Sequence, residues 1–174
     1  MQAQAGIVIS ESHNPFHDNS IKFFGGDGYK LPDAVEDELE KIVHRIEAND
    51  DLSRANGSEV GTTEYRHDLL KQYMDFVMAT TDERFEGMKI VLDCANGAAY
   101  EAMPTILHRL GAEVVVMSNK PNGTNINADC GSTHLHALQE AGGGEKAALA
   151  LAIVGGGVRS LWGGKRGETS GGPP

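Results

Sequence analysis

The sequence has little positive charge, few cysteines and no long apolar run, and each shortage excludes a class of protein. Its 174 residues include 15 Lys and Arg against 25 Asp and Glu, which gives a formal net charge of -10. Because nucleic acids and anionic membranes bind clustered basic side chains, we expect neither as a partner. The longest apolar run, 147–154, is far shorter than the roughly 20 residues of a membrane span. Two cysteines without CxxC spacing predict a reduced, cytoplasmic protein.

Aspartate is missing from the last quarter of the chain, where glycine is abundant. No Asp follows Asp129, and only Glu145 and Glu168 are acidic after residue 140. Of the 22 glycines, 11 lie after that residue. At the other end, the chain opens almost directly on the apolar segment 6–10, which has the pattern of a buried strand. We therefore expect the chain to be incomplete at both ends.

Hydrophobic periodicity predicts an α/β fold with mainly parallel mixed sheets and flanking helices. Strands are predicted at 6–10, 21–24, 60–65, 89–94, 113–117 and 148–154, and helices from Asp33 onward, over 66–79, up to Leu110 and over 134–141. Strands and helices alternate in the second half, so parallel pairing with right-handed crossovers is expected there. The predicted divisions are 1–65, 66–162 and an irregular tail, 163–174.

A polar loop directly after the first strand is the first candidate for chemistry. It reads Ser10-Glu11-Ser12-His13-Asn14-Pro15. Ligand sites in α/β sheets favour the carboxyl ends of strands, and Pro15 restricts the conformation of Asn14. A serine held there can act as a nucleophile if a base or a metal activates it. On the pattern alone, an ordinary polar turn is about twice as frequent as a site.

Two further basic residues have both a structural and a functional interpretation. Lys22 interrupts the apolar segment 21–24; it either extends its ammonium group to water or faces a cleft as a general acid or base. Arg159 ends the stretch Val154-Gly155-Gly156-Gly157-Val158-Arg159, which follows a predicted strand. Such a glycine-rich turn can hold phosphate, and Arg159 could bind it, but a plain turn is the more frequent outcome.

Cys130, His134 and His136 have a spacing that loosely suggests zinc. A second thiolate pair is absent from the sequence, so we do not expect a zinc site there.

Five segments together resemble the α-D-phosphohexomutase family, and within it the bacterial branch that acts on glucosamine phosphates. They are residues 6–15 (GIVISESHNP), 18–24 (DNSIKFF), 89–100 (KIVLDCANGAAY), 123–127 (GTNIN) and 130–134 (CGSTH). The resemblance implies part of a four-domain cytoplasmic isomerase, with one partial and one near-complete phosphohexomutase domain in this chain. It also implies a phosphosugar substrate, glucosamine 6-phosphate, converted through a bisphosphate to glucosamine 1-phosphate. It leaves the oligomeric state open.

The same resemblance assigns roles to individual residues. Ser12 matches the phosphoserine, Lys22 a general acid or base, and His13 and Asn14 loop residues near the phosphate. Arg159 matches the arginine that ends the metal-binding loop.

The resemblance also implies a Mg²⁺ ion, held by a phosphoserine oxygen and three aspartates of an Asp-Gly-Asp-Gly-Asp-Arg loop. Here Val154, Gly156 and Val158 stand at the aspartate positions. None of them has a side-chain oxygen, which Mg²⁺ requires. We therefore expect this chain to bind Mg²⁺ poorly and to lack useful mutase activity. The alternatives are a fragment of a phosphomannomutase or phosphoglucomutase, or a non-catalytic pseudoenzyme.

Overall fold

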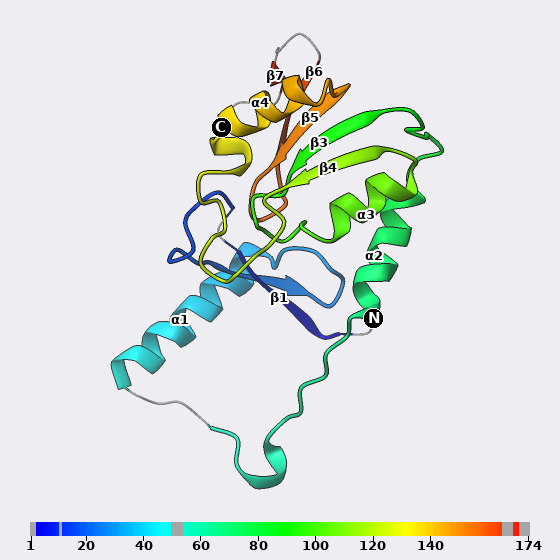
Figure 1. The fold of residues 1–174 in the computed structure, drawn as a ribbon. Helices are drawn as coiled ribbons and strands as arrows, with labels where there is room; N and C mark the ends of the chain where they lie inside the picture. Colours follow the sequence, from blue (N-terminus) through cyan, green and yellow to red (C-terminus); the bar gives the residue numbers. More distant parts are fainter. Residues whose placement is uncertain (1–2, 11, 50–53, 165–168, 171–174) are drawn as a thin grey trace. The chain divides into compact units, whose positions relative to one another are not determined.

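The chain forms two units, which are described separately. The computed structural model describes residues 3–10, 12–49, 54–164 and 169–170 (Figure 1). The first unit comprises residues 1–9 and 21–66, and the second comprises 10–20 and 67–174. The loop that carries Ser12 therefore belongs to the second unit, although both strands that flank it belong to the first. The domain boundaries expected from the sequence stay a prediction.

The first unit contains a two-stranded sheet and a long helix. β1 (Ala5–Ile9) pairs with β2 (Ile21–Gly25) in antiparallel register, with Ile7 opposite Phe23 and Ile9 opposite Ile21. Because side chains alternate along a strand, these four share one face. All four are exposed, from 40% at Phe23 to 68% at Ile9. Helix α1 (Asp33–Asn49) and a short 3-10 helix, η1 (Gly57–Glu59), follow.

The predicted strand at 60–65 is wrong. These residues follow η1 and belong to neither described sheet. Val60 and Tyr65 are 60% and 83% exposed. Their β-favouring side chains therefore have no neighbouring strand and no core to pack against, and β propensity alone does not form a strand.

The second unit is built on a five-stranded sheet with the order β4-β3-β5-β6-β7. Its strands are β3 (Lys89–Asp93), β4 (Glu113–Met117), β5 (Leu149–Ile153), β6 (Ser160–Gly164) and β7 (Thr169–Ser170). β3 pairs in parallel with both β4 and β5, so the predicted parallel sheet is confirmed. β6 pairs antiparallel with β5, and β7 pairs antiparallel with β6. The mixed character of this sheet comes from those two strands.

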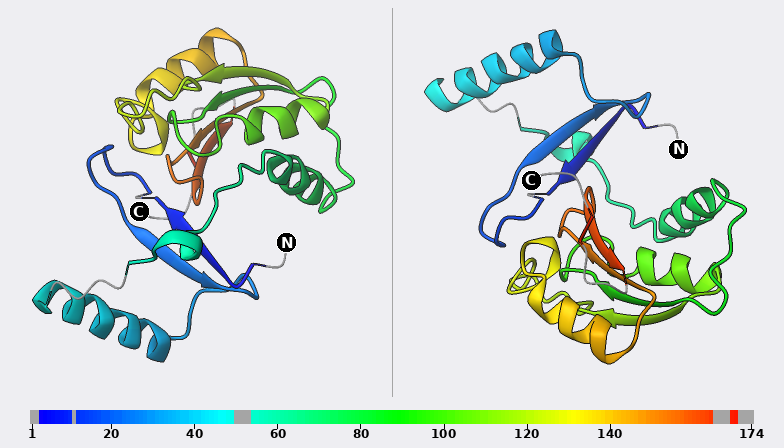
Figure 2. Two further views of the ribbon diagram at one scale, coloured as in Figure 1. Left: turned by 90° about the horizontal axis from the view of Figure 1, so that it is seen from below. Right: turned by 90° about the horizontal axis from the view of Figure 1, so that it is seen from above.

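Helices cover both faces of this sheet. They are α2 (Asp68–Met78), α3 (Ala102–Arg109) and α4 (His136–Gly144), with a 3-10 helix, η2 (Gly131–Thr133), before α4. Leu107 of α3 packs in a core cluster with Ile90 and Leu92, whereas Leu138 of α4 packs with Val91 on the other face. α2 packs on α3 through Met74 (Figures 1 and 2). β3 is buried on both faces, as its unbroken apolar sequence predicts.

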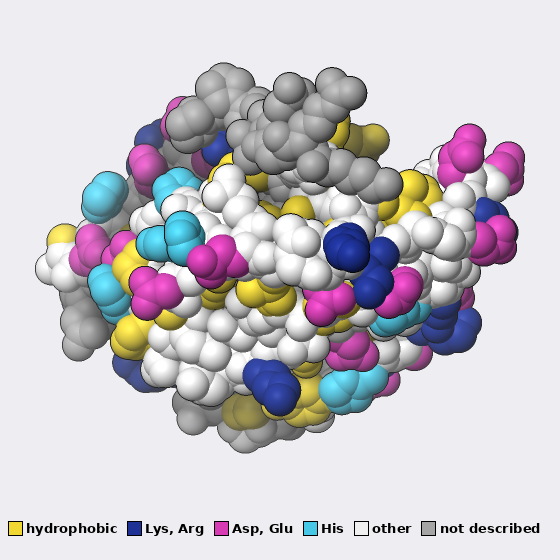
Figure 3. Space-filling view, turned by 45° about the horizontal axis from the view of Figure 1, so that its top comes forward, with side chains coloured by type: hydrophobic (Ala, Val, Ile, Leu, Met, Phe, Trp, Pro, Cys, Tyr) yellow, Lys and Arg dark blue, Asp and Glu magenta, His cyan; other side chains and the backbone are white. Residues whose placement is uncertain are grey.

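The displayed face of the molecule (Figure 3) carries charges of both signs, and no described helix could span a membrane. On the face that Figure 3 displays, Lys and Arg side chains stand among acidic ones rather than in one continuous area. Within the described ranges, none of the helices is both long and apolar enough to span a membrane.

Candidate active site

Asp93 ends β3 and organises the loops at the carboxyl edge of the parallel strands. Its carboxylate is only 1% exposed and accepts two backbone hydrogen bonds. Ala95 N–H donates to Oδ1 (2.9 Å), and Gly131 N–H donates to Oδ2 (2.7 Å). Both oxygens are thus used to hold backbone. Asp93 therefore shapes the site and is not free to react.

The loop 10–20 is closed at its base and tightly turned at Ser12. Ser10 N–H donates to the Ser20 carbonyl oxygen (3.0 Å), and the Ser20 hydroxyl donates back to the Ser10 carbonyl oxygen. Within the loop, Asn14 Nδ2 donates to Asp18 Oδ2 (3.1 Å). Ser12 is half-buried and has φ +45°. Such left-handed backbone is uncommon for serine and needs support from its surroundings.

The glycine-rich stretch 154–159 forms the turn between β5 and β6, which we call the glycine turn. Gly157 N–H donates to the Val154 carbonyl oxygen (2.8 Å), and Val154 N–H donates to that of Arg159 (3.1 Å). Gly157 has φ +70°, a conformation that favours glycine. Ala98 N–H donates to the Gly155 carbonyl oxygen (2.8 Å), which ties the turn to the loop after β3.

The loop 10–20 and the glycine turn are in direct contact within the second unit. Gly156 N–H donates to the Ser12 carbonyl oxygen (3.0 Å). Asn127 links the same two segments through its side chain: Nδ2 donates to the carbonyl oxygens of Ser12 (3.2 Å) and Asn14 (2.8 Å), and Oδ1 accepts from Gly155 N–H (2.8 Å). The structure therefore brings Ser12, Asn14 and the glycine turn together.

The residues at this junction do not fit a Mg²⁺ ion. Val154 is 3% exposed and Val158 is 70% exposed, and neither side chain carries an oxygen. A Cβ atom on Gly156 would lie 2.6 Å from the Ser10 hydroxyl oxygen. Among the residues the structure describes, no group of three or more His, Cys, Asp or Glu side chains could hold a metal. The hard oxygen ligands that Mg²⁺ requires are therefore not supplied by these side chains.

Known proteins resemble the chain in sequence and in fold. Residues 1–50 match the family model described as phosphoglucomutase/phosphomannomutase, alpha/beta/alpha domain I. The chain is 50% identical over 154 residues to a phosphoglucosamine mutase of Desulforudis audaxviator, covering 88% of this chain and 34% of that protein. It is 52% identical over 138 residues to a phosphoglucosamine mutase of Desulforamulus reducens, covering 79% of this chain and 31% of that protein. The chain belongs to the phosphohexomutase family.

A solved structure of this family supports the fold. A phosphoglucomutase/phosphomannomutase family protein from Burkholderia thailandensis aligns with a TM-score of 0.71 at 23% identity, over 95% of this chain and 34% of that protein. This likeness concerns the fold alone. The phosphohexomutase chain spans about a third of the length of the curated relatives it matches.

The structure describes three further predicted site residues of this phosphohexomutase chain: His13, Lys22 and Arg159. His13 and Arg159 are exposed, and only the Arg159 carbonyl oxygen is tied to the glycine turn. Lys22 is exposed on β2, in register with Val8. It belongs to the first unit, so its role beside Ser12 stays a prediction.

Both cysteines are buried and free. Burial, followed by the charge of Asp93, raises the pKa of the Cys94 thiol to about 12. Burial is also the largest cause that raises the pKa of Cys130, and it outweighs the hydrogen bonds with Ser118 and Asn96. A high pKa keeps a thiol protonated and weakly nucleophilic. The cysteines are therefore packing residues of the site and not its nucleophiles.

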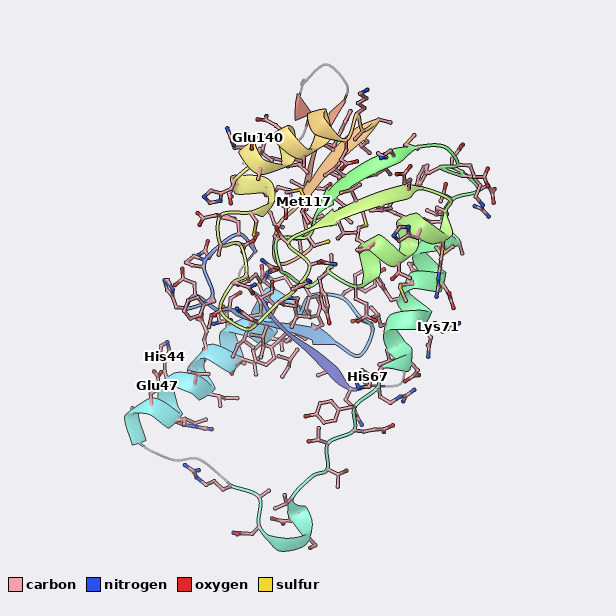
Figure 4. The ribbon with its side chains drawn as sticks, viewed as in Figure 1. His44, Glu47, His67, Lys71, Met117 and Glu140 are labelled. Atoms are coloured by element: carbon pink, nitrogen blue, oxygen red, sulfur yellow. The ribbon has the colours of Figure 1, made fainter. Side chains whose placement is uncertain are left out.

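Several charged side chains form ion pairs on helix surfaces. Lys71 Nζ of α2 lies 2.7 Å from Asp75 Oδ2, and Glu140 Oε2 of α4 lies 3.7 Å from His136 Nδ1 (Figure 4). On α1, His44 Nδ1 lies 3.5 Å from Glu47 Oε2 (Figure 4). Pairs of this kind one turn apart support a helix and do not indicate a site.

The residue of this junction that the sequence did not single out is Asn127. It ends the segment 123–127 that resembles the family, and the sequence predicted no role for it. Its position in the long loop after β4, near the carboxyl edge of the sheet, is one signal that could have found it. A second is its residue type, since asparagine tolerates the left-handed backbone (φ +57°) that it adopts here.

Proposed function

We propose that the chain is part of a cytoplasmic phosphoglucosamine mutase, which interconverts glucosamine 6-phosphate and glucosamine 1-phosphate, and that Ser12 is its phosphoryl-carrying serine. The observation that supports this most strongly is the loop 10–20 itself. Within this loop, Ser12 lies at the carboxyl edge of the parallel strands, and the Ser12 carbonyl oxygen accepts a hydrogen bond from Gly156 N–H (3.0 Å). The resemblance of this loop and of 89–100 to the mutases favours the same function.

In this proposal the roles of the neighbouring residues follow from their chemistry. The Ser12 hydroxyl accepts a phosphoryl group from the sugar bisphosphate and returns it to the sugar. Lys22 exchanges the proton of the attacking or leaving hydroxyl. His13 and Asn14 shape the loop next to the phosphate, and Arg159 offers a planar pair of donors to phosphate oxygens.

We further propose that this chain does not itself carry out the reaction. Phosphoryl transfer depends on neutralising charge on the transferring group, which Mg²⁺ supplies when it is bound. Val154, Gly156 and Val158 replace the side chains that would hold it. The chain also spans only about a third of the length of the relatives that it matches. A non-catalytic role for this sequence is therefore the second candidate.

A chimera tests the proposal directly. The segment of the Desulforudis audaxviator mutase that matches this chain is replaced by the residues of this chain, and glucosamine 1-phosphate formation is measured with Mg²⁺ present. We expect the unmodified chimera to be at least about a thousandfold slower than the parent enzyme, because the metal ligands are missing. Adding Val154→Asp, Gly156→Asp and Val158→Asp together should restore measurable turnover.

Two controls separate the parts of this proposal. Ser12→Ala in the restored chimera should abolish turnover, whereas Ser132→Ala, which alters a half-buried serine of η2, should not. Turnover in the unmodified chimera would contradict the metal part of the proposal. Turnover that survives Ser12→Ala would contradict the assignment of Ser12.

A further inference from the structure

We propose that Asn127 is a positioning residue, whose buried amide group fixes the backbone of the Ser12 loop against the glycine turn without a metal ion. The proposal rests on the proposed function, because a fixed loop has a catalytic purpose only if Ser12 carries the phosphoryl group.

The hydrogen bonds of the Asn127 side chain, two donated and one accepted, all join it to backbone groups. Both protons of Nδ2 are donated, to the carbonyl oxygens of Ser12 (3.2 Å) and Asn14 (2.8 Å). Oδ1 accepts from Gly155 N–H (2.8 Å), and Asn127 N–H donates to the Ala95 carbonyl oxygen (2.9 Å). The residue is 8% exposed, so water competes little for these bonds. One side chain thereby joins the loop 10–20 to the glycine turn and, through its own backbone, to the loop after β3.

Asparagine suits this position better than any related residue. The two carbonyl oxygens require two protons from one atom, and Gly155 N–H requires an acceptor beside it. A carboxylate supplies acceptors only, and a hydroxyl supplies a single proton. The backbone of Asn127 has φ +57°, which asparagine tolerates and which a longer or branched side chain disfavours.

The junction is closely packed, above all at Gly155. A Cβ atom on Gly155 would lie 2.7 Å from Asn127 Nδ2. A Cβ atom on Gly156 would lie 3.2 Å from Ser12 Cα as well as 2.6 Å from the Ser10 hydroxyl oxygen. The contact between the loop and the turn is therefore made by backbone and by the Asn127 amide. This arrangement supports the left-handed backbone at Ser12.

Hydrogen exchange of backbone amides in the full chain tests the proposal. Asn127→Asp keeps the size of the side chain and the acceptor for Gly155 but removes both protons. We expect the protected amides within residues 12–20, a range in which Pro15 has no amide hydrogen, and that of Gly156 to exchange about tenfold faster, as the loss of two neutral hydrogen bonds predicts. The amides of β3 should exchange at the wild-type rate.

The matched control is Asn125→Asp. Asn125 lies in the same loop and bridges in a similar way, donating from Nδ2 to the Lys120 carbonyl oxygen (3.0 Å) and accepting from Asn122 N–H (2.9 Å). Neither bond reaches the loop 10–20. This variant should leave the exchange of residues 12–20 unchanged, and an equal acceleration in both variants would contradict the proposal.

The dependence on pH gives a readout that a general loss of structure would not give. A protonated carboxyl group regains one O–H donor. Burial and the two carbonyl oxygens that it faces should raise the pKa of this carboxyl group. As the pH falls below that raised pKa, the exchange ratio between the Asn127→Asp variant and the wild type should fall toward one. Excess Mg²⁺ should not slow exchange in the wild type. A ratio independent of pH, or protection by Mg²⁺, would overturn the proposal.

If Asn127→Asp also accelerates exchange in β3, the Asn127→Gly variant distinguishes a local effect on the loop 10–20 from a general loss of structure. Glycine removes the side chain but accepts the positive φ without strain. Acceleration confined to residues 12–20 and Gly156 supports the proposal, and wild-type exchange there contradicts it. Hydrogen exchange does not require Ser12 to react. The exchange result is therefore independent of the chimera assay, which tests the proposed function.

Discussion

The carboxylate of Asp93 and the backbone N–H of Gly131 are hydrogen-bonded at 2.7 Å across 38 residues of sequence. The other carboxylate oxygen accepts from Ala95 N–H, so a single buried side chain holds two of the loops that surround Ser12 and the glycine turn. The geometry of these loops thus depends on a buried side chain whose two oxygens both accept backbone hydrogen bonds. Four predictions follow from this relationship and its surroundings.

Asp93→Asn should destabilise the second unit by about 2–4 kcal/mol, because the new NH₂ group faces a backbone N–H and leaves a buried donor unpaired. The free energy of unfolding is measured from urea denaturation followed by circular dichroism. Asp82→Asn, at an exposed position, is the control and should change it by less than about 0.5 kcal/mol. An equally small effect at Asp93 would show that its charge-assisted bonds are dispensable.

Gly131→Ala should cost more stability than Gly123→Ala, although both glycines have positive φ, +74° and +93°. Around Gly123 the space is open, so only backbone strain of about 1 kcal/mol is expected. A Cβ atom on Gly131 would lie 2.8 Å from the Ile153 carbonyl oxygen and 2.7 Å from Ala95 Cβ. We expect a total loss of at least about 3 kcal/mol there. Equal losses of thermal stability in the two variants would contradict the packing at Gly131.

Neither cysteine of the folded chain should react readily with iodoacetamide. The pKa of Cys94 is raised to about 12, so at about pH 8 only about one Cys94 thiol in ten thousand is ionised. The raised pKa means that the thiolate becomes populated only at strongly alkaline pH, and burial limits access as well. Intact-mass spectrometry should show no adduct on the native chain and two adducts after denaturation. Rapid single alkylation of the native chain would show that one thiol is accessible.

Much of the fold was predictable because the core pattern is local. The apolar residues 90–92 lie in β3, and the apolar run at 148–154 contains β5. Helix α3 ends shortly before Gly111, whose φ of +97° favours glycine. β6 was missed because Ser160–Gly164 is rich in glycine and lacks a clear alternation of apolar residues. α4 continues to Gly144 beyond its predicted end, since packing of Leu138 stabilises it despite poor helix formers.

The candidate site was only partly predictable for a different reason. Ser12 was a candidate because a strand, a polar loop and Pro15 are adjacent in sequence, but that pattern alone favours an ordinary turn. Its role came from the family resemblance and stays a prediction. Asn127 was missed because its partners are backbone groups, 113 residues away at Asn14 and 115 at Ser12. Every residue type has a backbone carbonyl group, so the residue types at 12 and 14 do not reveal their contact with Asn127. The pKa of Cys94 likewise depends on tertiary burial and not on a motif.

Calorimetric titration of the purified chain with Mg²⁺ tests the central claim most directly, namely that the Ser12 loop persists where the ion's ligands have been lost. We predict only a heat of dilution, without saturation, up to several millimolar Mg²⁺, because Val154, Gly156 and Val158 offer no side-chain oxygen. Saturable binding of one Mg²⁺ per chain at submillimolar concentration, abolished by substitutions in the glycine turn, would contradict the account.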